Sequence, residues 1–129
     1  MSRARTRPNV VRDRSFELAV AIVKLCMRLQ SKREYILSKQ LLRSGTSIGA
    51  NIEEALAGHS RRDFLFKMTI AHKEARETHY WLRLLTHSQP VPVDVTHELE
   101  ATEDVLRLLS SITKTTRQRS VPDRPIPNS

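Results

Sequence analysis

The 129-residue sequence predicts an all-α protein: an antiparallel, up-down four-helix bundle with a flexible basic tail at each end. Four segments repeat apolar residues every three or four positions, and no segment alternates apolar and polar residues as a strand does. Glycine is rare, with 3 residues, and the connections are mostly short, as in antiparallel bundles. The length suits one domain. We expect a basic arm over 1–14, the bundle over 15–116 and a proline-containing tail over 117–129.

The first helix is expected over residues 15–29, with Ser15 as its N-cap. Its apolar residues cover most of the helix circumference, so we expect it to be buried on more than one side. These residues are Phe16, Leu18, Ala19, Val20, Ile22, Val23, Leu25, Cys26 and Leu29. Glu17 and Lys24 interrupt the apolar run, which argues against a secretion signal or a membrane span. With the single cysteine, this predicts a cytoplasmic protein.

The second helix is expected over residues 38–57, followed by Gly58, a residue type common after helix ends. It contains Gly45 and Gly49, although a glycine inside a helix costs about 1 kcal/mol relative to alanine. Both lie on its apolar side, which predicts close approach by a helix of the same chain or of another subunit. The opposite polar stripe is either a solvated face or a hydrogen-bonding seam. It consists of Gln40, Ser44, Ser47, Asn51 and Glu54.

The third helix is expected to begin after Ser60, which forms a capping-box pattern with Asp63. A core stripe follows at spacings of four and three. It consists of Phe64, Met68, Ala71, Ala75, Thr78, Leu82 and Leu85. Pro90 and Pro92 interrupt the helical pattern, and the fourth helix is expected over residues 96–115. Its expected inward residues are Leu99, Ala101, Val105, Leu106, Leu108, Leu109 and Ile112.

The net charge of +8 lies mainly in the two ends of the chain. Residues 1–14 hold five arginines against one aspartate, and residues 114–129 hold four basic residues against one aspartate. Such ends are either solubilising tails or contacts to nucleic acid. The candidate nucleic-acid-binding residues of the N-terminal arm are Arg3, Arg5, Arg7, Arg12 and Arg14.

A second candidate surface lies on the third helix. Its residues recur at spacings of four, three and four, which places them on one side of a helix. They are His72, Arg76, His79 and Arg83. This stripe is either a solvated face or a surface for phosphates. The sequence contains no Glu-x-x-His pair, no glycine-rich phosphate loop and no recognisable pair of nucleophile and base. We therefore expect no enzyme, no metal site and no cofactor.

The stretch "LLRSGTSIGANIEEA", followed by "SRRDF" and "IAHKEARE", resembles the signature of a bacterial four-helix-bundle family. This family is encoded in intervening sequences of 23S ribosomal RNA genes. The resemblance covers roughly residues 15–115. Gly49 departs from the family pattern, which often has proline there. The motif residues expected to serve packing and assembly are Arg43, Gly45, Ser47, Ile48, Gly49, Asn51, Ile52 and Glu54.

The resemblance implies a four-helix bundle that assembles into a ring, typically a homopentamer. The chain is also similar to accessory proteins of diversity-generating retroelements, which form basic pentameric barrels that bind nucleic acid and a reverse transcriptase. Two functions stay open. One is an oligomeric, non-enzymatic protein that binds structured RNA or DNA with little sequence specificity. The other is an assembly or adaptor scaffold whose ring binds another protein.

Overall fold

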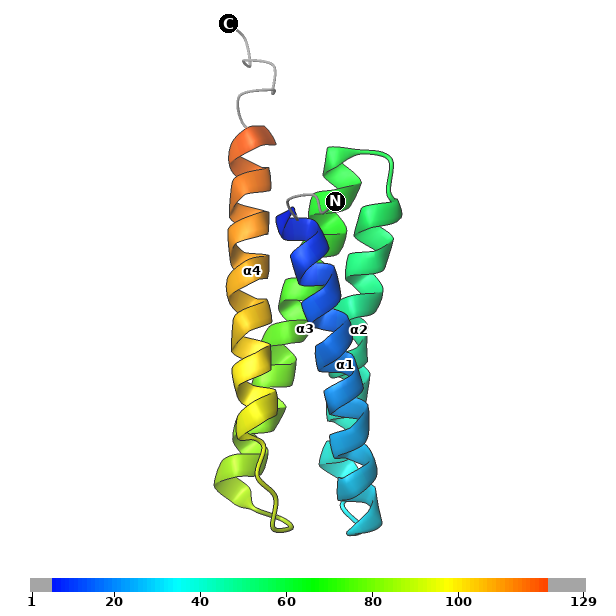
Figure 1. Cartoon of the computed structure of the whole chain (residues 1–129), viewed down its shortest axis with the longest axis vertical. Helices are drawn as coiled ribbons and strands as arrows, with labels where there is room; N and C mark the ends of the chain where they lie inside the picture. The colour runs from blue at the N-terminus through cyan, green and yellow to red at the C-terminus, as the bar shows by residue number, and fades with distance from the viewer. Residues whose placement is uncertain (1–5, 121–129) are drawn as a thin grey trace, which may run out of the picture.

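The computed structural model describes residues 6–120 of the chain and contains four α-helices in that range. They are α1 (Arg7–Ser31), α2 (Ile36–Ala57), α3 (Arg61–Ser88) and α4 (Thr96–Ser120). Successive helices run in opposite directions (Figure 1). Each helix packs against two others, in the cyclic order α1, α2, α3, α4. The predicted all-α four-helix fold is therefore confirmed.

Helix α1 begins at Arg7 rather than at Ser15. Thr6 is the N-cap, and its hydroxyl accepts a hydrogen bond from the backbone amide three residues later at 3.3 Å. Pro8 lies in the first turn, where a helix needs no amide donor. The prediction of Ser15 as an N-cap is wrong, because Ser15 is buried inside α1 and donates to the carbonyl oxygen of Arg12 at 3.0 Å. Residues 7–14 thus belong to the bundle and not to a flexible arm.

Apart from the end of α4, the other helix ends lie close to their predicted positions. The Asp63 amide donates to the Ser60 hydroxyl at 3.0 Å, as the capping pattern predicted. Gly58 follows α2 in an extended conformation, and a Cβ there would meet the Asp63 carboxylate, the end of a flexible side chain that can move aside. Helix α4 continues to Ser120. The first residues of the predicted tail over 117–129 are therefore helical, and the rest lie outside the described residues.

Apolar side chains from all four helices form one core. Its largest members are fully buried: Leu18, Ile22, Leu25 and Leu29 from α1, Leu41, Ile48 and Ile52 from α2, Met68, Leu82 and Leu85 from α3, and Leu109 from α4. The predicted α3 stripe is buried except for Phe64, which is half-buried. None of the helices in residues 6–120 has the length and hydrophobicity that crossing a membrane requires.

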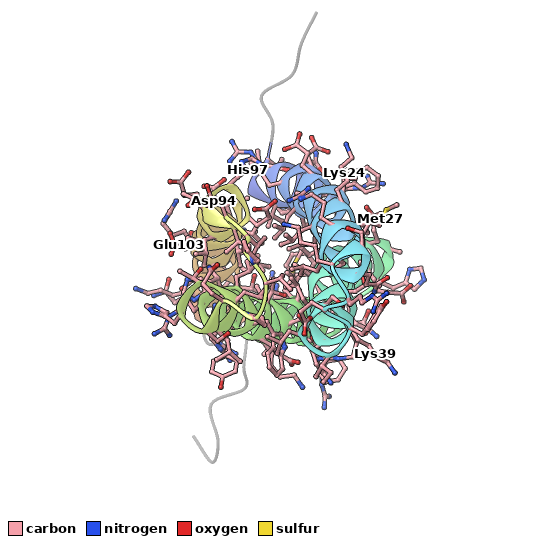
Figure 2. The ribbon with its side chains drawn as sticks, turned by 90° about the horizontal axis from the view of Figure 1, so that it is seen from below. Lys24, Met27, Lys39, Asp94, His97 and Glu103 are labelled. Atoms are coloured by element: carbon pink, nitrogen blue, oxygen red, sulfur yellow. The ribbon has the colours of Figure 1, made fainter. Side chains whose placement is uncertain are left out.

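The outer side of α1 carries a second apolar stripe. Phe16, Val20, Val23 and Met27 are 67%, 40%, 38% and 66% exposed, respectively. Figure 2 shows Met27 at the periphery of the bundle, near the outward-pointing Lys24. The expectation that this helix is buried on more than one side is therefore wrong for the single chain, in which only its inner side is buried. The outer stripe faces away from the core.

Cys26 is expected to be unreactive in the folded protein. Its thiol is 2% exposed and donates a hydrogen bond to the carbonyl oxygen of Ser38 at 3.3 Å. Burial, with a smaller contribution from the negative charge of Glu34, raises the pKa of Cys26 to about 11. At pH 8 the thiolate that attacks alkylating reagents is thus scarce. Mass spectrometry after iodoacetamide treatment should show labelling only when guanidinium is present. Rapid labelling of the native protein would contradict this placement.

Candidate nucleic-acid interface

The arginines assigned to the N-terminal arm are partly paired within the bundle. The Arg12 Nε atom donates to the Glu53 carboxylate of α2 at 2.8 Å, and Arg14 forms an ion pair with Asp104 of α4. All four side chains are at least one-third exposed, so these pairs are individually weak. They attach the first turns of α1 to its two neighbours. Outside the described side chains lie Arg3, Arg5 and Arg7.

The predicted stripe on α3 divides into two parts. His79 Nε2 lies 3.0 Å from the Glu103 carboxylate of α4, so an acidic neighbour offsets any positive charge on this histidine. Arg83 lies toward the end of α3 and lines a small hollow of about 120 Å³ with Tyr80 and His87. His79 is thus paired across the α3–α4 contact, whereas Arg83 lies beside a hollow nearer the end of α3.

His72 and Arg76 instead share a surface with Arg117 of α4. The Arg117 guanidinium donates to the Thr69 hydroxyl of α3 at 3.5 Å. Burial, then the positive charges of Arg76 and Arg117, lower the pKa of His72 below its ordinary value and so favour its neutral form. Within the described residues neither arginine has an acidic partner. We call His72, Arg76 and Arg117 the α3–α4 basic patch.

A second basic region lies at the end of the bundle where α4 ends. A hollow of about 350 Å³ opens there between the end of α2, the start of α3 and the last turns of α4. Its basic side chains are His59, Arg61 and Arg119. Arg61 Nη1 donates to the Arg119 carbonyl oxygen at 3.2 Å, which joins α3 to α4. Figure 1 shows the start of α1 at this same end of the bundle.

The motif residue Arg43 connects α2 to α3. Its Nη1 lies 3.2 Å from a Glu74 carboxylate oxygen, and its Nη2 binds Glu77, which also accepts a hydrogen bond from Trp81 at 3.3 Å. The hydrogen bond to Glu77 is the main cause that raises the pKa of Arg43. Glu74 is buried, and a buried carboxylate needs a positive charge nearby, which Arg43 supplies. The motif arginine is therefore a structural residue in this fold.

The polar stripe of α2 contains one contact to a neighbouring helix. The buried hydroxyls of Ser44 and Thr78 lie 3.0 Å apart, across the α2–α3 contact. Ser47 and Asn51 instead donate to backbone carbonyl oxygens one turn earlier in α2, at 2.6 and 2.9 Å. The interpretation as a hydrogen-bonding seam thus applies to Ser44, while Glu54 is exposed.

The two glycines of the motif face α1 of the same chain. A Cβ built on Gly45 would lie 2.8 Å from Ile22 Cγ2, which is closer than van der Waals contact allows. A Cβ on Gly49 would lie 3.5 Å from the Ser15 hydroxyl oxygen, an ordinary contact distance. Gly45 therefore permits the close packing of α1 on α2, whereas Gly49 is not required for space. Within the single chain, the helix that approaches Gly45 closely is therefore α1.

The described residues offer no cluster of three His, Cys, Asp or Glu side chains that could hold a metal ion. Their distinctive features are instead the α3–α4 basic patch, the basic hollow and the outer stripe of α1. None of these brings a nucleophile and a base together.

Comparisons with known proteins place these features in context. A family model described as 23S rRNA-intervening sequence protein matches residues 7–112. A solved structure from Bacteroides thetaiotaomicron, described as a protein with unknown function from the S23 ribosomal protein family, is 46% identical. The similarity covers 84% of this chain and 99% of that one, with a TM-score of 0.79. No curated protein shows significant similarity. Neither description names a catalytic activity, and the likeness to retroelement accessory proteins stays a prediction.

Proposed function

Because the chain belongs to the 23S rRNA-intervening sequence protein family, we propose that it is a non-enzymatic, oligomeric bundle protein that binds structured RNA or other nucleic acid with little sequence specificity. The observation that carries this proposal is the α3–α4 basic patch, where two arginines lie together without an acidic partner in the described residues. The alternative function is that of a scaffold that binds another protein and no nucleic acid.

The position of the basic groups supports binding to phosphates rather than to base edges. Arg117 belongs to the α3–α4 basic patch, and Arg119 lies two residues further along α4 in the basic hollow. Both are exposed side chains on a rigid helix. Arginine contacts of this kind neutralise phosphates, and they add affinity without reading sequence. Arg3 and Arg5 precede α1, which begins at this end of the molecule (Figure 1).

The outer stripe of α1 supports assembly with further copies of the chain. Four large apolar side chains at helical spacing form a continuous exposed face, and such faces commonly mark protein interfaces. The family resemblance suggests a ring, typically a homopentamer. A ring repeats each basic patch, so several phosphates of one RNA molecule are bound at once and the total affinity rises.

Binding of a fluorescently labelled RNA hairpin, measured against salt concentration, tests the nucleic-acid function. We expect log K to fall linearly with log salt. The double variant Arg76→Gln/Arg117→Gln should bind more weakly and reduce the slope by about two, roughly one per lost phosphate contact. The loss reflects the removal of two guanidinium groups that have no acidic partner among residues 6–120.

A double variant with the same change in charge is the control for this experiment. Lys39→Gln/Arg107→Gln alters exposed residues of α2 and α4 outside the α3–α4 basic patch, and Figure 2 shows the outward position of Lys39. It should retain most of the wild-type affinity. Equal weakening by both double variants would overturn the assignment to the patch. Absence of binding at low salt would overturn the nucleic-acid function and favour the scaffold.

A further inference from the structure

The hollow at the end of the bundle has the size and charge of a small anion-binding site. It is the basic hollow lined by His59, Arg61 and Arg119, and we call it the terminal hollow from here on. It measures about 350 Å³, within the range of roughly 300–1,000 Å³ typical of small-molecule pockets. Three of its lining residues are basic and none is acidic. By contrast, the hollow beside Arg12 contains Asp13, Glu17 and Glu53, whose charges would repel a phosphate.

The terminal hollow also has an apolar side. Phe64, Leu56 and Ala55 line it, and the ring of Phe64 is half-buried against the core. Aromatic side chains bind nucleobases by stacking, and they do so with every base because each base has a π-face. A basic side and an aromatic side in one hollow match the two halves of a nucleotide.

The two arginines that line the terminal hollow come from two helices, which a hydrogen bond joins. The hydrogen bond of 3.2 Å from Arg61 to the Arg119 carbonyl oxygen fixes the start of α3 against the last turns of α4. Arg119 itself is exposed. A guanidinium carries five N–H donors, so an arginine can hold protein contacts and an anion at the same time. Arginines from two different helices thus line the same hollow.

We propose that the terminal hollow binds one nucleoside monophosphate unit, with its phosphate at Arg61 and Arg119 and its base against Phe64. The unit is part of an RNA strand, so this assignment rests on the proposed function and names a second point of contact beyond the α3–α4 basic patch. It would restrict binding to RNA that can place an unpaired nucleotide at the end of the bundle.

Titration calorimetry with adenosine monophosphate, adenosine and inorganic phosphate tests the inference on the full chain. We expect the monophosphate to bind at least about tenfold more tightly than either part alone, because each part makes only one of the two contacts. Arg119→Gln should weaken the monophosphate about tenfold through loss of a charge-assisted contact. Phe64→Leu keeps an apolar side chain and should weaken it about fivefold through lost stacking.

Arg107→Gln is the matched control, because it removes the same charge from α4 outside the terminal hollow and should leave binding unchanged. Equal binding of the monophosphate and inorganic phosphate would overturn the role of Phe64. No binding of the monophosphate, with hairpin binding intact and sensitive to Arg76→Gln/Arg117→Gln, would overturn this inference alone. Monophosphate binding without any hairpin binding would assign the hollow to a free nucleotide and overturn its place in an RNA interface.

Discussion

Replacement of Gly45 by leucine is expected to lower the free energy of unfolding by about 3 kcal/mol, at the upper end of the usual cost of overpacking a core. The first added carbon would already lie 2.8 Å from Ile22 Cγ2, and three more carbons must follow it into the α1–α2 contact. Ile22 is β-branched and fully buried, so it cannot rotate away easily. Denaturation with guanidinium, followed by circular dichroism, measures the change.

Gly49→Ala provides the control for Gly45→Leu. Here the added Cβ makes an ordinary contact of 3.5 Å with the Ser15 hydroxyl, and alanine is the better helix former. We expect this variant to be more stable than the wild type by up to about 1 kcal/mol. An unchanged denaturation midpoint for Gly45→Leu would mean that α1 can shift away from α2. A loss of stability for Gly49→Ala would mean that both glycines are needed for space.

The apolar repeats predicted four helices, but they could not locate the start of α1. Residues 7–14 contain four charged side chains and show little helical periodicity. Their helix is capped by Thr6, has Val11 fully buried in the core, and is joined to α2 and α4 by the weak pairs of Arg12 and Arg14. Such contacts join positions that are far apart in the sequence, so a local pattern does not reveal them.

The basic surface on α3 could likewise be predicted only in part from the sequence. Helical spacing correctly placed His72 and Arg76 one turn apart on α3, because this spacing is a local property. Two contacts depend instead on how α4 is rotated and aligned against α3. Glu103 lies beside His79, and Arg117 lies beside Thr69. A sequence pattern fixes neither quantity. The apolar repeat also predicts an end of the fourth helix at residue 115, and it therefore places Arg117 in the tail.

The double variant Val20→Lys/Met27→Lys is expected to abolish oligomer formation. It places two charges in the middle and at one end of the outer stripe of α1, where assembly would bury them without partners. Burying an unpaired charge costs several kcal/mol, so each interface should dissociate at micromolar concentration. Light scattering after size-exclusion chromatography should show a single-chain mass of 14.8 kDa. Tyr80→Lys changes an exposed aromatic residue on α3 and should leave the oligomer intact.

The same double variant separates assembly from charge in RNA binding. It keeps every residue of the α3–α4 basic patch and gains two positive charges, so electrostatics alone predicts equal or tighter binding. If a ring binds several phosphates of one RNA at once, the monomer should instead lose about a hundredfold in affinity. Undiminished binding by the monomer would show that one bundle is sufficient. A wild-type protein that is itself monomeric would overturn the assembly part of the proposal, and a variant that stays oligomeric would move the interface to another face, such as that of the exposed Phe66 on α3.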